Sequence, residues 1–263
     1  MADPIFFPPI PLTFPSGHCA QALWLMPHHT SQQILSGLSL EWPRPTLVIV
    51  GGAGLMAEDS QQRLQRFFQE VLAPLAEDLG LTVIDGGTDA GVMRLMGQAR
   101  HRLGGTFPLV GVLPQGQVKR SEVPDSRSQD PQAEGPENDL EPHHTHFLFV
   151  PGQEWGCESA WIADLATALA PPQLALTLLI NGGKIAATDF HLNLAAGRPM
   201  LVLAGSGRLA DEVAAALAGD DQDIPPTLRE VIQHYHASGA LLSLDMGLPV
   251  ADLRRQLGAY FTP

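Results

Sequence analysis

Glycines follow four of the short apolar segments in this 263-residue sequence. A turn without side chains lets a ligand touch the backbone, and the helix that follows directs free N–H groups and a partial positive charge toward it. That chemistry suits a phosphate group, and four such turns together favour a nucleotide-like ligand. In chain order the turns contain Gly51, Gly52, Ala53 and Gly54; Gly86, Gly87 and Gly91; Gly182 and Gly183; and Gly205 and Gly207.

Charged side chains stand next to these glycines. Arg208 can clamp a phosphate through two parallel hydrogen bonds, or it can be a solvated residue in the first turn of a helix. Lys184 offers a point charge to a phosphate, or it is an exposed surface amine. Asp89 can accept from a ribose hydroxyl, or it can cap the following helix. Asp211 and Glu212 suit either ribose binding or a helix dipole, and we favour the dipole.

Glu158 is the one carboxylate that we single out as a candidate general acid or base. A catalytic carboxylate must be held in a pocket beside the proton that it transfers. The simpler interpretation is that Glu158 is a partner of a helix dipole or a ribose ligand.

Three neighbouring histidines, His143, His144 and His146, suggest a metal site. They end a polar, acidic segment and lack a firm fourth ligand, so we predict no metal centre. Cys19 and Cys157 form no CxxC pair, and we expect two reduced thiols.

The composition limits the partners of the chain. Its formal charge is −13, and it has no stripe of Lys and Arg, which argues against nucleic-acid binding. The apolar stretches are too short to span a bilayer, and prolines interrupt the apolar N-terminus, which does not look like a signal peptide. We therefore expect a soluble, cytoplasmic protein without a membrane partner.

Strand-like segments alternate with helical patterns along the chain. Leu64, Phe67, Val71 and Leu75 recur at helical spacing, and Pro74 should kink that helix. The alternation predicts an α/β fold: a doubly wound, mainly parallel sheet of about seven strands with helices on both faces. Its glycine turns would collect at one edge, outside the carboxyl ends of the strands. The predicted strands are 46–50, 81–85, 108–113, 146–151, 175–180, 199–204 and 240–245.

Two segments depart from this alternation. Residues 1–45 form an N-terminal extension packed on the main domain of residues 46–263, with one added strand and a short helix capped by Thr30 or Ser31. Residues 114–145 are rich in Pro, Ser, Gln and acids, which predicts a flexible acidic insert.

Common nucleotide motifs fit poorly. The segment GGAGLM has the wrong spacing for G-x-G-x-x-G, and the sequence contains no Walker pattern. We therefore do not expect a redox dehydrogenase or a P-loop NTPase.

The segments IVGGAGLM, VIDGGTDAGVMRLMGQA, HTHFLFVPGQEWGCESAWIADL and LVLAGSGRLADEV carry a family resemblance. In order and spacing, residues 46–250 resemble the SLOG superfamily. The likeness is closest to the cytosolic amino-terminal region of melastatin-type TRP channels and its stand-alone bacterial relatives, the LSDAT group. The resemblance implies a Rossmann-like fold and a nucleotide-derived ligand: ADP-ribose or a cyclic relative in some members, and a nucleoside monophosphate that loses its base in the enzymatic branch.

Three family turns transfer directly, and one departs from the pattern. After the turn at 182–183, Ile185 and Ala186 replace a glycine and a threonine, which removes one phosphate donor. The enzymatic branch has a glutamate beside the sugar for which we find no match, Thr188 and Asp189 being the nearest polar groups. The transferred residues are Gly51, Gly52 and Ala53; Gly86, Gly87, Thr88 and Gly91; and Gly205, Ser206, Gly207 and Arg208, with Glu158 matching an acid of the channel relatives.

We expect a binding or sensing protein for ADP-ribose, an NAD-related molecule or another phosphorylated nucleoside, with no further cofactor required. One alternative is an N-glycosidic hydrolase of nucleoside monophosphates or dinucleotides. A second alternative is a non-catalytic interaction module with a vestigial pocket. A second copy of the chain is a further candidate partner, since members of the superfamily often associate.

Overall fold

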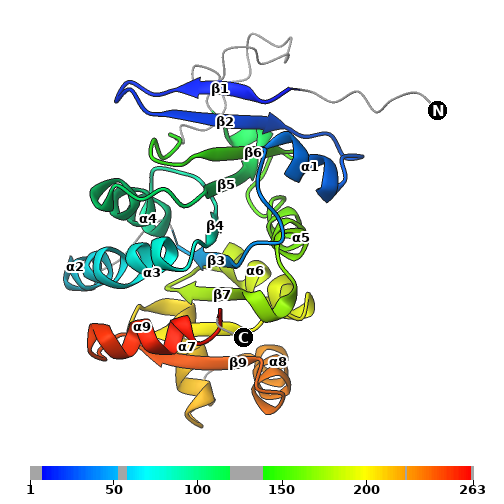
Figure 1. Ribbon diagram of the computed structural model, residues 1–263. Coiled ribbons are helices and arrows are strands. Elements are labelled where there is room, and N and C mark those ends of the chain that lie inside the picture. Colours follow the sequence, from blue (N-terminus) through cyan, green and yellow to red (C-terminus); the bar gives the residue numbers. More distant parts are fainter. Residues whose placement is uncertain (1–7, 53–57, 119–138, 223, 262–263) are drawn as a thin grey trace.

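A computed structural model describes residues 8–52, 58–118, 139–222 and 224–261. Within them, nine strands form one sheet in the order β1-β2-β6-β5-β4-β3-β7-β8-β9 (Figure 1). Neighbouring strands run parallel, except for the antiparallel pair of β1 and β2. The strands are β1 (Ile10–Thr13), β2 (Cys19–Trp24), β3 (Thr46–Gly51), β4 (Thr82–Asp85), β5 (Leu109–Pro114), β6 (His146–Val150), β7 (Ala175–Ile180), β8 (Met200–Ala204) and β9 (Leu241–Asp245).

The seven predicted strands correspond to β3 to β9, and the predicted doubly wound α/β fold is confirmed. From β3 the chain builds the sheet outward to β6 and then crosses back to place β7 on the other side of β3. The strand order therefore reverses between β3 and β7. In open α/β sheets, ligands bind at such a topological switch point, outside the carboxyl ends of the strands.

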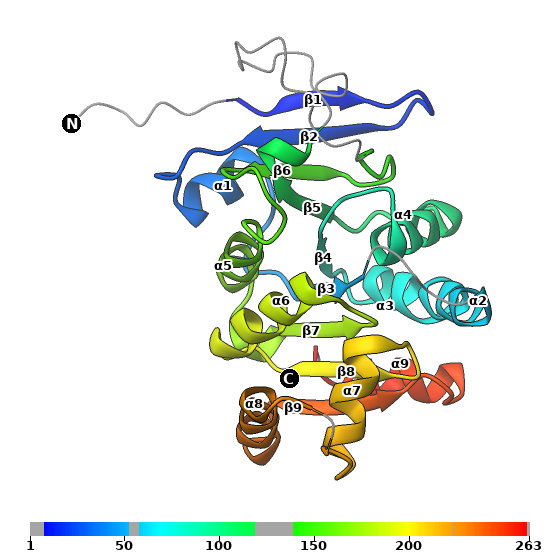
Figure 2. The ribbon, with the colours of Figure 1, turned by 180° about the vertical axis from the view of Figure 1, so that it is seen from behind.

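Helices cover both faces of the sheet, as Figures 1 and 2 show from opposite sides. Helices α1, α5, α6, α7 and α8 pack on one face, and α2, α3, α4 and α9 pack on the other. Among the described residues, no helix is both long and apolar enough to cross a membrane. The helices are α1 (Ser31–Gly37), α2 (Glu58–Phe67), α3 (Ala73–Asp78), α4 (Gly91–Leu103), α5 (Ser159–Leu169), α6 (Lys184–Ala195), α7 (Arg208–Leu217), α8 (Pro226–Ala237) and α9 (Val250–Gly258).

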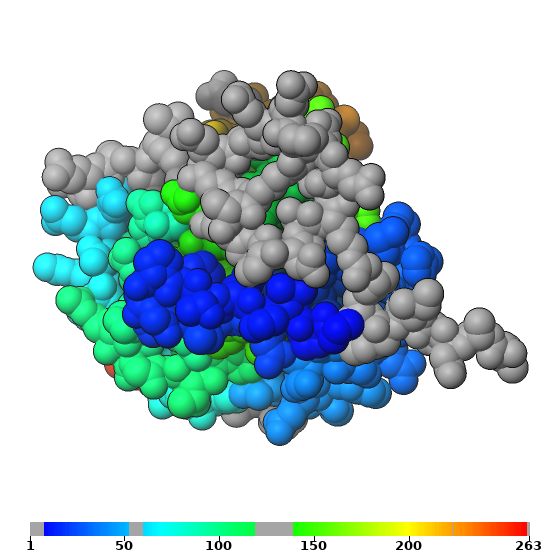
Figure 3. Space-filling view, turned by 90° about the horizontal axis from the view of Figure 1, so that it is seen from above, coloured from blue at the N-terminus to red at the C-terminus, as the bar shows by residue number. Residues whose placement is uncertain are grey.

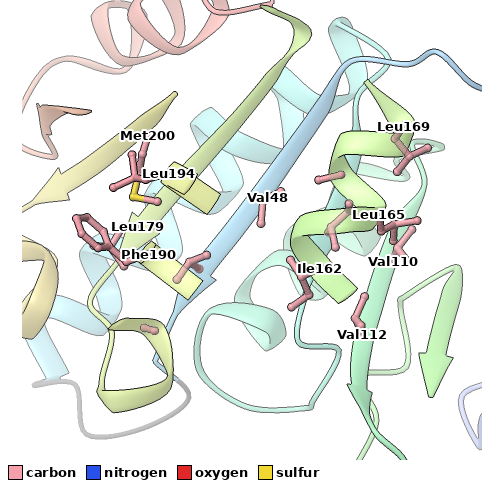
Figure 4. Close-up of a cluster of buried hydrophobic side chains, with 14 of the residues drawn as sticks. Val48, Val110, Val112, Ile162, Leu165, Leu169, Leu179, Phe190, Leu194 and Met200 are labelled. Carbon is pink, nitrogen blue, oxygen red and sulfur yellow. The ribbon is translucent and has the colours of Figure 1, made fainter. Parts of the chain in front are cut away.

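The two faces of the sheet carry separate hydrophobic clusters because side chains alternate along each strand. Val48 belongs to the cluster under α5 and α6, and its neighbour Leu47 belongs to the cluster under α2 to α4. Figure 4 shows the first cluster, in which Ile162 and Leu165 of α5 lie against Val110 of β5. Burial on both faces explains why these strands read as continuous apolar segments in the sequence.

The helix predicted between the first two core strands changes its winding before Pro74. Residues Phe68–Leu72 form a π-helical segment, η1, between α2 and α3. The N–H of Ala73 there donates to the carbonyl of Phe68. Such a local change is one of the known ways in which a helix accommodates an interior proline.

The N-terminal extension adds two strands to the sheet rather than one. Helix α1 begins as predicted, with Thr30 and Gln33 forming a capping box. Strand β2 pairs in parallel with β6, and β1 folds back on β2 through a tight turn. Figure 3, a view onto this end of the molecule, shows the N-terminal hairpin in blue lying across the domain.

The predicted flexible insert at 114–145 is too long at both ends, since Pro114 ends β5 and Gln115–Gln117 form a short 3-10 helix. Residues 119–138 lie outside the described residues, but Leu140, Glu141 and His144 are buried, and Thr88 forms an isolated β-bridge with Leu140. The segment 139–145 belongs to the packed domain, since His144 pairs with buried Asp85, and Glu141 pairs with His143 and His144.

Candidate functional site

The glycine turns meet at one edge of the sheet, around the switch point. Strands β4, β3, β7 and β8 are consecutive in the sheet, and each is followed by one of the four turns. Ala53 and Gly54 lie outside the described residues. The remaining predicted turn residues are therefore brought to a single edge, as the parallel topology requires.

Two of these glycines have packing reasons of their own. A Cβ atom added to Gly51 would lie 2.7 Å from the carbonyl oxygen of Ile180 and 2.8 Å from a methyl group of Val92. At Gly87, which has a φ of +70°, a Cβ atom would lie 2.8 Å from the Cα of Gly111. These two positions hold strands and helices close together, whatever ligand the edge binds.

Arg208 crosses from the β8 turn to the turns after β7 and β3. A Cβ atom on Gly183 would lie 2.8 Å from Nη2 of Arg208, and one on Gly52 would lie 3.6 Å from Nη1. The guanidinium thus lies against bare backbone at the switch point. Arg208 also adopts a φ of +50°, a left-handed conformation that is uncommon for a residue with a side chain and is often found at functional sites.

The helices that follow the β4, β7 and β8 turns begin without a side-chain cap. The N-cap residues of α4, α6 and α7 are Ala90, Gly183 and Gly207, and none makes a side-chain cap hydrogen bond. The first N–H groups of a helix have no partner within the helix, so they can donate to an anion. Lys184, the first residue of α6, is exposed at the same place.

Asn181 joins the β7 and β8 turns and was not identified from the sequence. Its backbone N–H donates to Oγ of Ser206 over 2.8 Å, and its Nδ2 donates to the carbonyl of Ser206 over 3.1 Å. The Ser206 hydroxyl in turn donates to Leu203, so this predicted ligand residue has a structural role within the turn. Among the described residues, Oδ1 of buried Asn181 has no hydrogen-bond partner, and it would lie 3.2 Å from a Cβ atom on Gly52.

Several acidic and polar side chains at this edge already have partners. Oδ1 of Asp89 lies 2.7 Å from Nε of Arg94. Asp211 accepts from the backbone N–H of Gly205 over 2.7 Å. Thr88 is buried beneath the segment 139–141.

Glu158 interacts electrostatically with a second buried carboxylate, Asp189. Glu158 is the N-cap residue of α5, where Oε2 accepts from the N–H of Gly156 over 2.7 Å, and Asp189 lies in the second turn of α6. Burial raises the pKa of Glu158 to about 7, and the charge of Asp189 adds to this shift. Burial also raises the pKa of Asp189 to about 6. Two carboxyl groups with pKa values near neutrality can exchange protons with a bound molecule.

A buried arginine fixes the two helices that carry this pair. Nη2 of Arg198 donates to the carbonyl of Ala163 and to Oγ1 of Thr167 of α5, each over 2.9 Å. Its Nη1 donates to Oδ1 of Asn193 of α6. Because α5 and α6 are held together in this way, the separation of Glu158 and Asp189 is fixed by the fold.

A second buried network lies behind the β4 turn. Asp85 accepts from the N–H of Gly87 over 2.8 Å, and the same oxygen lies 2.8 Å from Nε2 of His144. Nδ1 of His144 lies 2.9 Å from Glu141. Burial lowers the pKa of His144, but the two carboxylates more than offset it and raise the pKa to about 9. A protonated histidine between two carboxylates therefore holds the Gly86–Gly87 turn in place.

These features define a class of protein: an α/β protein with a Rossmann-like sheet and glycine turns gathered at its switch point. Residues 44–245 match the family model described as SLOG in TRPM, prokaryote, and the chain belongs to this family. The resemblance inferred from the glycine turns is thereby confirmed.

The chain is also similar to two known proteins. It is similar to transient receptor potential cation channel subfamily M member 2 of Rattus norvegicus, with 24% identity over 204 residues. That match covers 66% of this chain but only 13% of the channel subunit. The X-ray structure of the protein TM1055 aligns with a TM-score of 0.51 and 19% identity over 81% of this chain and 97% of that protein, a likeness that concerns the fold.

Proposed function

We propose that this protein binds a phosphorylated, nucleotide-derived ligand, with a phosphate group held between Arg208 and the first turn of α6. The position of the guanidinium against Gly183 supports this most strongly. A cation is unfavourable beside the positive end of a helix dipole. Among the described residues, no carboxylate pairs with Arg208. A bound anion between the two positive groups would make the arrangement favourable.

The residues around Arg208 can also bind the ribose of a nucleotide. The free Oδ1 of Asn181 can accept a hydrogen bond from a ribose hydroxyl, and burial makes an unpaired acceptor unfavourable without a ligand. The family resemblance favours ADP-ribose or an NAD-related molecule. The net charge of −13 requires that such an anion be bound by local groups rather than attracted by the whole surface.

Replacing Arg208 by alanine should weaken binding of ADP-ribose more than tenfold, about 1.4 kcal/mol, because the phosphate loses two charge-assisted hydrogen bonds. Titration calorimetry on the wild type and the variant measures this. Arg208→Lys should fall between the two, since an ammonium keeps the charge but not the planar fork.

Arg102→Ala is the matched control. Arg102 lies in the last turn of α4, at the opposite edge of the sheet, where it donates to Gln69. We expect its affinity for ADP-ribose to equal that of the wild type. Equal affinity in Arg208→Ala would remove Arg208 from the binding site.

A second candidate function is cleavage of an N-glycosidic bond, and the Glu158–Asp189 pair favours it. A carboxyl group with a pKa of about 7 can donate a proton to a leaving base near neutral pH, and a second carboxylate can stabilise the sugar cation or activate water. Glu158 begins α5, and Asp189 lies in the second turn of α6, the helix that follows the β7 turn.

Release of the base from AMP, NAD or ADP-ribose, followed by chromatography, tests the hydrolase. Turnover should fall at least about a hundredfold in Glu158→Gln, the usual scale for the loss of general acid or base catalysis. Glu154→Gln, which alters an exposed carboxylate nearby, should retain full turnover. If the wild type releases no base from any of these compounds, the hydrolase hypothesis is wrong and only the binding function stands.

A further inference from the structure

Three histidines from distant parts of the sequence converge at the other edge of the sheet. His18 lies in the turn between β1 and β2, His101 in the last turn of α4, and His143 just before β6. One ring nitrogen from each lies within 4.8 Å of the others. This edge holds the amino ends of the parallel strands, so the cluster is separate from the glycine turns. Figure 3 views the molecule from the side of the β1–β2 hairpin, which it shows in blue beside the green of the domain.

The rings are packed as a group. The ring centroids of His101 and His143 are 4.4 Å apart and nearly stacked, and His18 meets both edge-on at 4.9 Å and 4.8 Å. Burial lowers the pKa of His18, and the neighbouring His143, His101 and Arg100 lower it further. A neutral imidazole exposes the lone pair that a metal ion needs.

The carboxylate of Glu141 orients the ring of His143. Nδ1 of His143 lies 2.6 Å from Oε1 of buried Glu141, which leaves Nε2 of His143 as the ligand atom. A carboxylate on the far nitrogen of a histidine is the usual outer partner in zinc sites, where it fixes the ring and increases its basicity. Arg100 lies close by, but the carboxylates of Glu77 and Glu141 interact favourably with its charge.

We propose that His18, His101 and His143 bind one divalent transition-metal ion, with Zn²⁺ the best fit. Zinc takes imidazole nitrogens at about 2.0–2.1 Å in tetrahedral sites, which puts the nitrogens about 3.4 Å apart. The rings need only a small adjustment from 4.8 Å, and His101 is exposed and His18 lies in a turn. Water takes the fourth position. The ion links the N-terminal hairpin to α4 and to the entry of β6.

The test uses the full chain, freed of any histidine tag and of metal by dialysis against a chelator. Zn²⁺ alone is titrated in competition with a chromophoric chelator, and we expect one ion per chain with a Kd below about 1 μM. His101→Ala and His18→Ala should each weaken binding at least about a hundredfold. His101 is an exposed helix residue, so its alanine variant should fold normally.

His28→Ala is the matched control, because His28 and His29 form a ring pair with centroids 5.1 Å apart outside the cluster. It should bind Zn²⁺ like the wild type, and so should Arg208→Ala. X-ray absorption of the zinc-loaded protein should count three imidazole ligands. The proposal is overturned if the wild type takes up no Zn²⁺ at 100 times the expected Kd, or if His101→Ala and His18→Ala bind Zn²⁺ as tightly as the wild type.

Discussion

Gly97→Ala should lower the free energy of unfolding by about 3 kcal/mol. Alanine in a helix interior is normally more favourable than glycine by about 1 kcal/mol, so the expected sign is reversed here. Gly97 lies in α4, and an added Cβ atom would overlap the carboxylate of Glu141. The overlap forces Glu141 away from His143 and His144, which combines overpacking with the loss of a buried ion pair. Urea unfolding at pH 7 measures the difference.

Gly258→Ala is the control for a helix glycine with room around it. It lies at the end of α9, where a Cβ atom would be 3.6 Å from Leu75, an ordinary contact. We expect its stability to stay within about 0.5 kcal/mol of the wild type or to rise slightly. If Gly97→Ala were as stable as Gly258→Ala, then α4 would not be held against Glu141 in the way described.

Glu158→Gln should stabilise the protein by about 2 kcal/mol at pH 8 and have little effect at pH 4. The folded pKa of Glu158 is raised from 4.5 to about 7, so the folded state binds the proton more tightly than the unfolded chain. The stability that this carboxyl group contributes is complete below pH 4.5 and is lost as the pH rises through 7. A shift of one pKa unit corresponds to about 1.4 kcal/mol, which sets an upper limit of about 3 kcal/mol.

Glutamine preserves the acceptor for the N–H of Gly156 and removes the buried charge beside Asp189. The measurement is the difference in the free energy of unfolding between variant and wild type from pH 4 to 8. Glu154→Gln, on an exposed side chain, should give a flat difference near zero. A Glu158→Gln difference that is equally flat would mean that this carboxyl group is solvated.

The core of the fold was predictable because its signals are local. Each strand from β3 to β9 is a short apolar segment between helical patterns, and parallel strands buried on both faces must read in that way. Strand β1 was missed because Ile10–Thr13 contains Pro11 and lies in a proline-rich stretch. Proline is tolerated there because β1 is an edge strand.

The glycine turns of the site could be predicted, because glycine after a strand is visible in the sequence. Residues whose roles depend on contacts with distant parts of the chain could not be predicted. Glycine turns after strands indicate a binding site at the carboxyl ends of the strands. The family resemblance identified Arg208 as a candidate residue of that site. Asn181 gave no signal except its position between β7 and the glycine pair. His144 was assigned to a mobile segment on composition, although Asp85 and Glu141 satisfy its charge in the interior. The cluster of His18, His101 and His143 could not be predicted, because these residues are far apart in the sequence and only the fold brings them together.

Thermal unfolding against a panel of phosphorylated compounds tests the central claim most directly. The panel contains ADP-ribose, cyclic ADP-ribose, NAD and AMP, with inorganic phosphate and pyridoxal phosphate as comparisons, and each mixture is checked afterwards for released base. A ligand at 100 times its Kd adds about 2.7 kcal/mol of stability. We predict that at least one nucleotide raises the midpoint in the wild type and raises it less in Arg208→Ala. If no nucleotide raises the midpoint of the wild type, the glycine turns only connect strands to helices, and the proposed binding function is wrong.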